Sequence, residues 1–79
     1  MKNSIYTHEY QIFLKNLKTA RKESDLTQVE VARKLNQPQS YISKCESGEK
    51  RVDVIELLKF AKVYNKQIDY FIANIFDEN

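Results

Sequence analysis

The sequence predicts an all-α domain of five helices. Apolar residues recur at helical spacing in five segments, and residues that favour helix starts and ends separate these segments. No segment alternates apolar and polar residues as a half-buried strand does. The chain has 79 residues, of which 42% are hydrophobic and 30% are charged, so we expect a single domain over residues 1–79 around one small core.

Capping residues mark the first two predicted helices. Residues 9–22 carry apolar side chains at helical spacing, and Thr7 stands where an N-cap is expected. Thr27 precedes Glu30 by three residues, the capping-box pattern in which each side chain accepts a hydrogen bond from the other residue's backbone N–H. The second helix should begin at Thr27 and end at Asn36, because asparagine tolerates the left-handed conformation that ends helices. Its apolar face is expected to consist of Val29, Val31, Ala32 and Leu35.

The third predicted helix lies between Pro38 and Gly48. Proline fits the first turn of a helix and disrupts its interior, so the helix should begin at about residues 37–38, and Gly48 should end it. Ile42 and Cys45 have the spacing of its inner face. A lone thiol could act as a redox switch, but this spacing favours a buried structural thiol with no group nearby to activate it.

The fourth predicted helix has the strongest amphipathic pattern in the chain and a cap at Asp53. Its apolar residues are Val54, Leu57, Leu58, Ala61 and Tyr64. A fifth helix is expected within the apolar tail IDYFIANIF, residues 68–76. This tail holds more apolar residues than a monomer should expose, so residues 68–79 are a candidate dimerisation segment. The alternative is that the tail closes the protein's own core.

The second and third helices, over about residues 27–47, have the frame of a helix-turn-helix: two short helices joined by about four residues. In this motif the second helix presents its N-terminal residues to base edges in the DNA major groove. Polar side chains crowd that position here, namely Gln39, Ser40, Ser43 and Lys44. Glutamine can pair with adenine, serine can contact several bases, and lysine can reach guanine or phosphate. The alternative is a solvated helix start with a serine cap.

The stretch LTQVEVARKLNQPQSYISKCESGEKRVDVIELLKFAKVY resembles the lambda-repressor-like, XRE-type helix-turn-helix family of bacterial and phage transcription regulators. The similarity runs from about Phe13 to Phe71 and rests on the succession of residue types from LTQ through QSYIS to ESG. Two positions depart from the family. Asn36 stands where glycine is frequent at the turn, and it still permits the positive φ expected there. Cys45 stands where isoleucine or leucine is usual, and the smaller residue can pack more loosely.

The resemblance implies a role for each polar residue of the motif. It implies that base edges are contacted by Gln39, Ser40, Ser43 and Lys44. It implies that DNA phosphates are contacted by Gln28, Tyr41, Lys50 and Arg51, with Gln28 also helping to set the third helix in the groove. Arg21 and Glu46 match an ion pair between the first and third helices. The alternatives are surface charge for the basic residues and for this pair, and core packing for Tyr41.

Composition narrows the function classes. The formal net charge is +2, with a basic excess in residues 1–24 and an acidic excess in residues 52–79, an asymmetry that can orient a domain toward phosphate. One cysteine and one histidine cannot supply an internal disulfide or a zinc site, and we expect no enzyme activity, metal or cofactor. No apolar run approaches a membrane span, and the start lacks the apolar centre of a secretion signal. We therefore expect a cytoplasmic protein with no membrane or small-molecule partner.

The function expected from these features is transcription regulation. We expect the protein to bind a double-stranded DNA operator as a homodimer, with its two recognition helices about one turn of DNA, roughly 34 Å, apart. The alternative from another class is an antitoxin or a protein-interaction adaptor that uses the same fold without base readout. Steep salt dependence and sequence preference in DNA binding would distinguish the first from the second.

Overall fold

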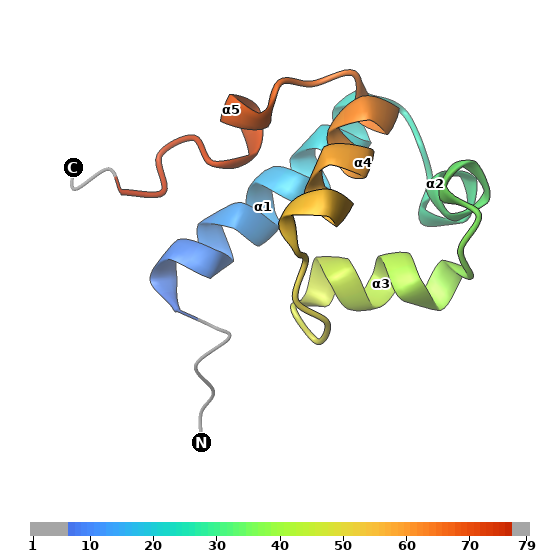
Figure 1. The fold of residues 1–79 in the computed structure, drawn as a ribbon, viewed down its shortest axis with the longest axis horizontal. Helices are drawn as coiled ribbons and strands as arrows, with labels where there is room; N and C mark the ends of the chain where they lie inside the picture. The colour runs from blue at the N-terminus through green and yellow to red at the C-terminus, as the bar shows by residue number, and fades with distance from the viewer. Residues whose placement is uncertain (1–6, 77–79) are drawn as a thin grey trace.

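Five helices make up the described part of the chain, residues 7–76, in the computed structural model (Figure 1). They are α1 (His8–Glu23), α2 (Gln28–Leu35), α3 (Gln39–Ser47), α4 (Val54–Tyr64) and α5 (Ile68–Phe71). The predicted all-α, five-helix fold class is confirmed, and residues 7–76 contain no strand. Helix α3 packs against α1 and α2, while α5 packs against α1 and α4. Helix α1 therefore contacts both α3 and the C-terminal helix α5.

The helix starts follow the capping residues predicted from the sequence. The Oγ1 atom of Thr7 caps α1 by accepting a hydrogen bond from the Tyr10 backbone N–H at 3.2 Å. Thr27 and Glu30 form the predicted capping box, with bonds of 3.1 and 2.8 Å. Asp53 caps α4, also as predicted. Each such cap contributes about 1 kcal/mol, so three helix starts are specified locally, before any packing.

The predicted helix ends are confirmed at two residues with positive φ. Asn36 ends α2 with φ 59° and ψ 44°, and Gly48 ends α3 with φ 88°. Pro38 differs from the prediction by one position, because it is the N-cap of α3 and Gln39 is the first helical residue. The extended backbone of Pro38 (φ −69°, ψ 155°) connects the left-handed turn at Asn36 to α3.

One core holds the helices together. Its largest fully buried side chains are Phe60, Phe71, Leu17, Ile42, Val31 and Cys45. Burying a side chain such as Leu17 or Phe60 contributes roughly 1.5–3 kcal/mol. The burial of Ile42 and Cys45 confirms the predicted inner face of the third helix. Burial also raises the pKa of the free Cys45 thiol, which favours the unreactive, protonated form.

The buried faces of α2 and α4 differ from the predicted apolar faces. Val29, expected on the inner face of the second helix, is exposed, and so are Val54 and Leu58 of α4. The buried residues of α4 are Leu57, Phe60, Ala61 and Tyr64. The outer side of this helix is apolar as well, because Ile55 joins Val54 and Leu58 there, and the sequence pattern did not separate the two sides.

The fifth helix is much shorter than predicted. It covers only Ile68–Phe71, and turns follow it over residues 72–76. Asn74 has φ 66°, a left-handed conformation that interrupts a helix. The Nδ2 group of Asn16 on α1 donates hydrogen bonds to the carbonyl oxygens of Phe71 at 2.9 Å and Ala73 at 3.2 Å. These carbonyl oxygens therefore accept hydrogen bonds from a side chain of α1 and not from the backbone of a longer α5.

Replacing Asn16 with alanine tests how this tail is held. The change removes two hydrogen bonds and leaves two carbonyls without that donor, so we expect the free energy of unfolding to fall by about 1–2 kcal/mol in urea denaturation. Amide hydrogen exchange in residues 71–76 should become faster. The control is Lys18→Ala, an exposed position on the same helix, where a change of less than about 0.5 kcal/mol is expected. Equal effects of the two variants would contradict the anchoring role of Asn16.

Candidate nucleic-acid interface

Helices α2 and α3 form a helix-turn-helix, with residues 36–38 as the turn. Val31 and Ala32 of α2 are buried in the same core as Ile42 and Cys45 of α3, so the two helices are fixed to each other by packing. In Figure 1, α3 runs along the lower edge of the molecule, and the other helices lie above it or at its end. No other helix of the described chain covers the lower side of α3 in this view.

The polar residues predicted to contact bases lie on the solvent-facing side of α3. Gln39, Ser40 and Lys44 are exposed, and Ser43 is half-buried. Positions i, i+1, i+4 and i+5 share one side of a helix, and the buried Ile42 and Cys45 hold the opposite side in the core. The described chain thus leaves the polar start of α3 accessible to solvent.

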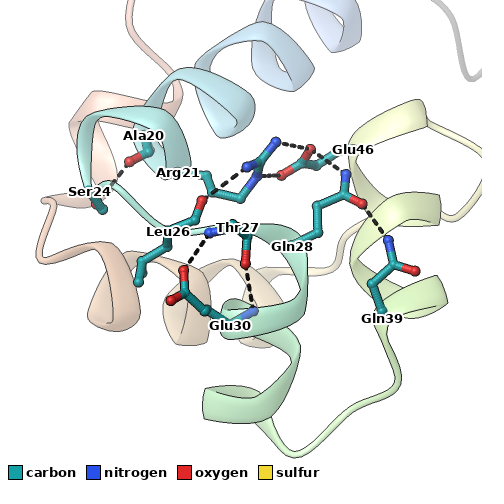
Figure 2. Close-up of polar contacts among 9 residues, drawn as sticks. All are labelled: Ala20, Arg21, Ser24, Leu26, Thr27, Gln28, Glu30, Gln39 and Glu46. Carbon is teal, nitrogen blue, oxygen red and sulfur yellow. Dashed lines mark hydrogen bonds and ion pairs between the residues drawn. The ribbon is translucent and has the colours of Figure 1, made fainter.

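A chain of hydrogen bonds connects this polar start to α1 (Figure 2). The Arg21 guanidinium donates to both carboxylate oxygens of Glu46, with Nε 2.6 Å from Oε2 and Nη2 3.2 Å from Oε1. Gln28 Nε2 donates to Glu46 Oε1 at 3.0 Å, and Gln39 Nε2 donates to Gln28 Oε1 at 2.6 Å. Three helices therefore contribute to one network that ends on the first residue of α3.

Glu46 is the buried centre of the network. Its side chain is only 4% exposed, and that of its partner Arg21 is 15% exposed. The hydrogen bond to Glu46 raises the pKa of Arg21, more than burial lowers it. Arg21 Nη1 also donates to the carbonyl oxygen of Leu26 at 3.0 Å, just before α2 begins. A buried carboxylate that accepts this many bonds fixes its donors in orientation.

The network determines which way the two glutamine amides point. Because the Gln28 NH₂ group donates to Glu46, its oxygen faces Gln39 and accepts from it. Gln39 uses one of its two N–H groups in this bond, so its carbonyl oxygen and its second N–H remain for another partner. The first amide of α3 is thereby held in a defined orientation before any ligand binds.

Like Gln28, the other three residues predicted to contact phosphate are engaged within the protein. The Tyr41 hydroxyl donates to Glu56 Oε2 at 2.8 Å, and its half-buried ring stacks on Phe60. Lys50 Nζ forms an ion pair with Glu56 at 2.7 Å. The Arg51 guanidinium lies over the ring of Tyr10, 4.3 Å from its centre, and remains exposed. Burial and the bond to Glu56 both raise the pKa of Tyr41, so it stays protonated.

Glu56 and Tyr10 are residues that the sequence analysis missed. Glu56 completes a capping box with Asp53, and their three-residue spacing was a readable signal. Its contacts with Tyr41 and Lys50 had no such signal, because they depend on how α3 and α4 pack. The Tyr10 hydroxyl accepts a hydrogen bond at 3.0 Å from the backbone N–H of Val52, 42 residues away. No local pattern predicts a bond over that separation.

The helix-turn-helix family model matches residues 17–71, more than two thirds of the chain and all of α2, α3 and α4. The protein belongs to the lambda-repressor-like, XRE-type helix-turn-helix family. This family consists of DNA-binding regulators. No curated protein matches the sequence closely enough to count as a relative.

The described residues contain neither a candidate metal site nor a candidate membrane-spanning helix. Within residues 7–76, no three His, Cys, Asp or Glu side chains gather in a way that could hold a metal ion. None of the helices described is both long and apolar enough to cross a membrane. A surface cavity of about 350 Å³ lies by the start of α1 and is lined by residues that include Tyr10, Phe13 and Leu57. It is separate from the polar side of α3.

A double-mutant cycle on Arg21 and Glu46 tests the network. Removing either partner alone leaves a largely buried charge unpaired, so each alanine variant should lose about 3 kcal/mol or more of unfolding free energy. The double variant should lose clearly less than the sum of the two, measured by chemical denaturation. Additive losses would show that the two residues act independently and would reject the network as a unit.

Proposed function

We propose that the protein is a small transcription regulator that binds double-stranded DNA sequence-specifically, with α3 in the major groove. The observation that carries the proposal is the polar start of α3, where Gln39, Ser40 and Lys44 are exposed beside the half-buried Ser43. A helix must present hydrogen-bonding side chains at its start to read base edges. The opposite side of α3 is anchored by Ile42 and Cys45.

Gln39 is the proposed centre of base recognition. Pairing with adenine requires a glutamine oxygen that accepts from N6 and an N–H that donates to N7. Gln39 retains both groups after its bond to Gln28. Since that bond already fixes the amide, little side-chain entropy remains to be lost when a base is bound. Ser40, Ser43 and Lys44 are proposed as the further base contacts.

Phosphate contacts are proposed for Gln28 and for the basic residues around α3. Gln28 keeps one N–H after its bond to Glu46, and this donor lies at the start of α2. Arg51 is exposed, and stacking on the ring of Tyr10 leaves the edge of its guanidinium for hydrogen bonding. Tyr41 and Lys50 can contribute only in competition with Glu56.

We propose a homodimer in the cytoplasm as the DNA-binding form. A single helix-turn-helix makes few base contacts, and a dimer places two recognition helices about one DNA turn apart. Exposed apolar side chains support an interface: the outer side of α4 contributes Val54, Ile55 and Leu58, and the tail contributes Ile72 and Phe76, the last 81% exposed. Of the expected dimerisation segment, residues 77–79 lie outside the described residues.

The second candidate is an antitoxin or adaptor that binds another protein and does not read bases. The same exposed apolar side of α4 favours it, because such a surface suits a protein partner. A DNA-binding regulator should show an affinity that falls steeply with salt and depends on sequence. An adaptor should ignore duplex DNA at all salt concentrations. We propose no catalytic residue for either candidate.

Replacing Gln39 with alanine tests base readout. On a site selected from random duplexes, we expect a loss of about 1–3 kcal/mol in binding free energy and a relaxed preference at one base pair. Fluorescence anisotropy with a panel of single-base variants of that site measures both effects. Gln67→Ala, an exposed glutamine next to α5, is the control and should change neither. A uniform loss over all sequences would assign Gln39 to the DNA backbone instead.

A further inference from the structure

We propose that Glu56 competes with DNA phosphate for the ammonium group of Lys50 and thereby lowers the affinity of the protein for duplex DNA of any sequence. The proposal rests on the proposed DNA-binding function. It concerns the loop after α3, residues 48–53, and the first turn of α4. Glu56 acts here on a neighbouring residue and has no DNA contact of its own.

All the hydrogen-bonding capacity of the Lys50 ammonium is used within the protein. Its Nζ atom lies 2.7 and 2.9 Å from the two carboxylate oxygens of Glu56 and 3.0 Å from the carbonyl oxygen of Arg51. A lysine ammonium has three donors and no acceptor. Three protein acceptors are therefore in place, and a phosphate oxygen can bind Lys50 only by displacing one of them.

Lys50 is placed where a phosphate contact would matter. Its backbone N–H donates to the carbonyl oxygen of Lys44 at 3.1 Å, so the residue is attached to the last turn of α3. Its Nζ also lies 5.5 Å from the centre of the Tyr41 ring, on the same helix. If α3 lies in a DNA groove, the charge of Lys50 therefore lies at the C-terminal end of α3, close to the DNA.

Two further hydrogen bonds hold the Glu56 carboxylate in place, so it stays there if Lys50 moves toward a phosphate. Its Oε1 accepts the backbone N–H of Asp53 at 2.9 Å, and its Oε2 accepts the Tyr41 hydroxyl at 2.8 Å. Burial raises the pKa of Glu56, but the hydrogen bonds from Lys50, Asp53 and Tyr41 together lower it by more, so the carboxylate stays charged at neutral pH. The side chain is 18% exposed.

The competition can go either way, and both outcomes weaken DNA binding. The Lys50 side chain is 41% exposed, and ion pairs of this kind contribute little stability, so phosphate can capture the ammonium. If it does, the fixed negative charge of Glu56 remains close to the phosphate and repels it. If it does not, the neutral pair releases no counterion from the DNA, and Lys50 adds nothing to the electrostatic term.

The Glu56→Gln variant removes the competing charge and keeps the local structure. Glutamine at this position of a capping box still accepts the N-cap N–H with its single carbonyl oxygen, and its amide nitrogen then stands in place of Oε2, where it can donate to the oxygen of the Tyr41 hydroxyl. The matched control is Glu49→Gln, which removes the same charge from an exposed residue next to Lys50 that takes part in none of the ion pairs found in residues 7–76. Thermal unfolding followed by circular dichroism checks that both variants fold.

The experiment measures affinity for a random-sequence duplex between 50 and 200 mM salt. We expect Glu56→Gln to bind more tightly than Glu49→Gln at 50 mM salt. If wild type withholds Lys50 from the DNA, the slope of log affinity against log salt should also be steeper by about 0.9 in Glu56→Gln than in Glu49→Gln, as for one additional phosphate contact, and the advantage should shrink about threefold over this range. If phosphate captures Lys50 in wild type, the two slopes should agree and only the affinities should differ. Adding Lys50→Ala should abolish the gain in the Glu56→Gln background in both cases.

Each other outcome overturns a distinct part of the account. If wild type binds duplex DNA and the two glutamine variants behave alike, the competition is rejected and the proposed function stands. If Glu56→Gln binds more weakly than Glu49→Gln, Glu56 positions Lys50 for DNA and does not withhold it. If neither wild type nor Glu56→Gln binds any duplex at 50 mM salt, both the proposed function and the competition are rejected.

Discussion

The buried carboxylate of Glu46 is the constraint on which the helix-turn-helix depends. It sits on α3 at 4% exposure and accepts hydrogen bonds from Arg21 of α1 and Gln28 of α2. A buried charge in that position is tolerated only because an ion pair and hydrogen bonds to both oxygens compensate the loss of water. The orientation of α3 relative to the other two helices is therefore coupled to the pairing of Glu46, and through Gln28 the same carboxylate orients Gln39 at the start of α3.

Two carboxylates act in opposite ways on groups that are proposed to contact DNA. Glu46 pairs with Arg21 and also accepts from the amide of Gln28, which in turn accepts from the amide of Gln39 and leaves that amide with free hydrogen-bonding groups. Glu56 binds a cation directly and leaves Lys50 with no unused donor. Base contacts specify sequence, whereas phosphate contacts add affinity for all sequences. Under the proposed function, Glu46 thus orients a group that would discriminate between DNA sites, and Glu56 restrains a group that would not.

The local features of the fold were predictable from the sequence, and the long-range contacts were not. Thr27, Asp53 and Asn36 are recognised from residue type and spacing, because a cap depends on only a few neighbouring residues. The end of α5 depends on Asn16, 55 residues before Phe71, and no periodicity in the tail reports that bond. The engagement of Tyr41 and Lys50 by Glu56 has the same origin. The resemblance implied phosphate contacts for these two residues but did not show their partner within the protein.

An NMR titration of the ¹⁵N-labelled protein with duplex DNA at low salt tests most directly whether the polar side of α3 is the DNA-binding surface. The account predicts that the largest shift changes fall on the backbone and side-chain amides of residues 39–44 and on the Gln28 side chain. The outer side of α4, residues 54–58, should change little on first contact with the DNA. Changes concentrated on α4, with the amides of α3 unaffected, would contradict the account.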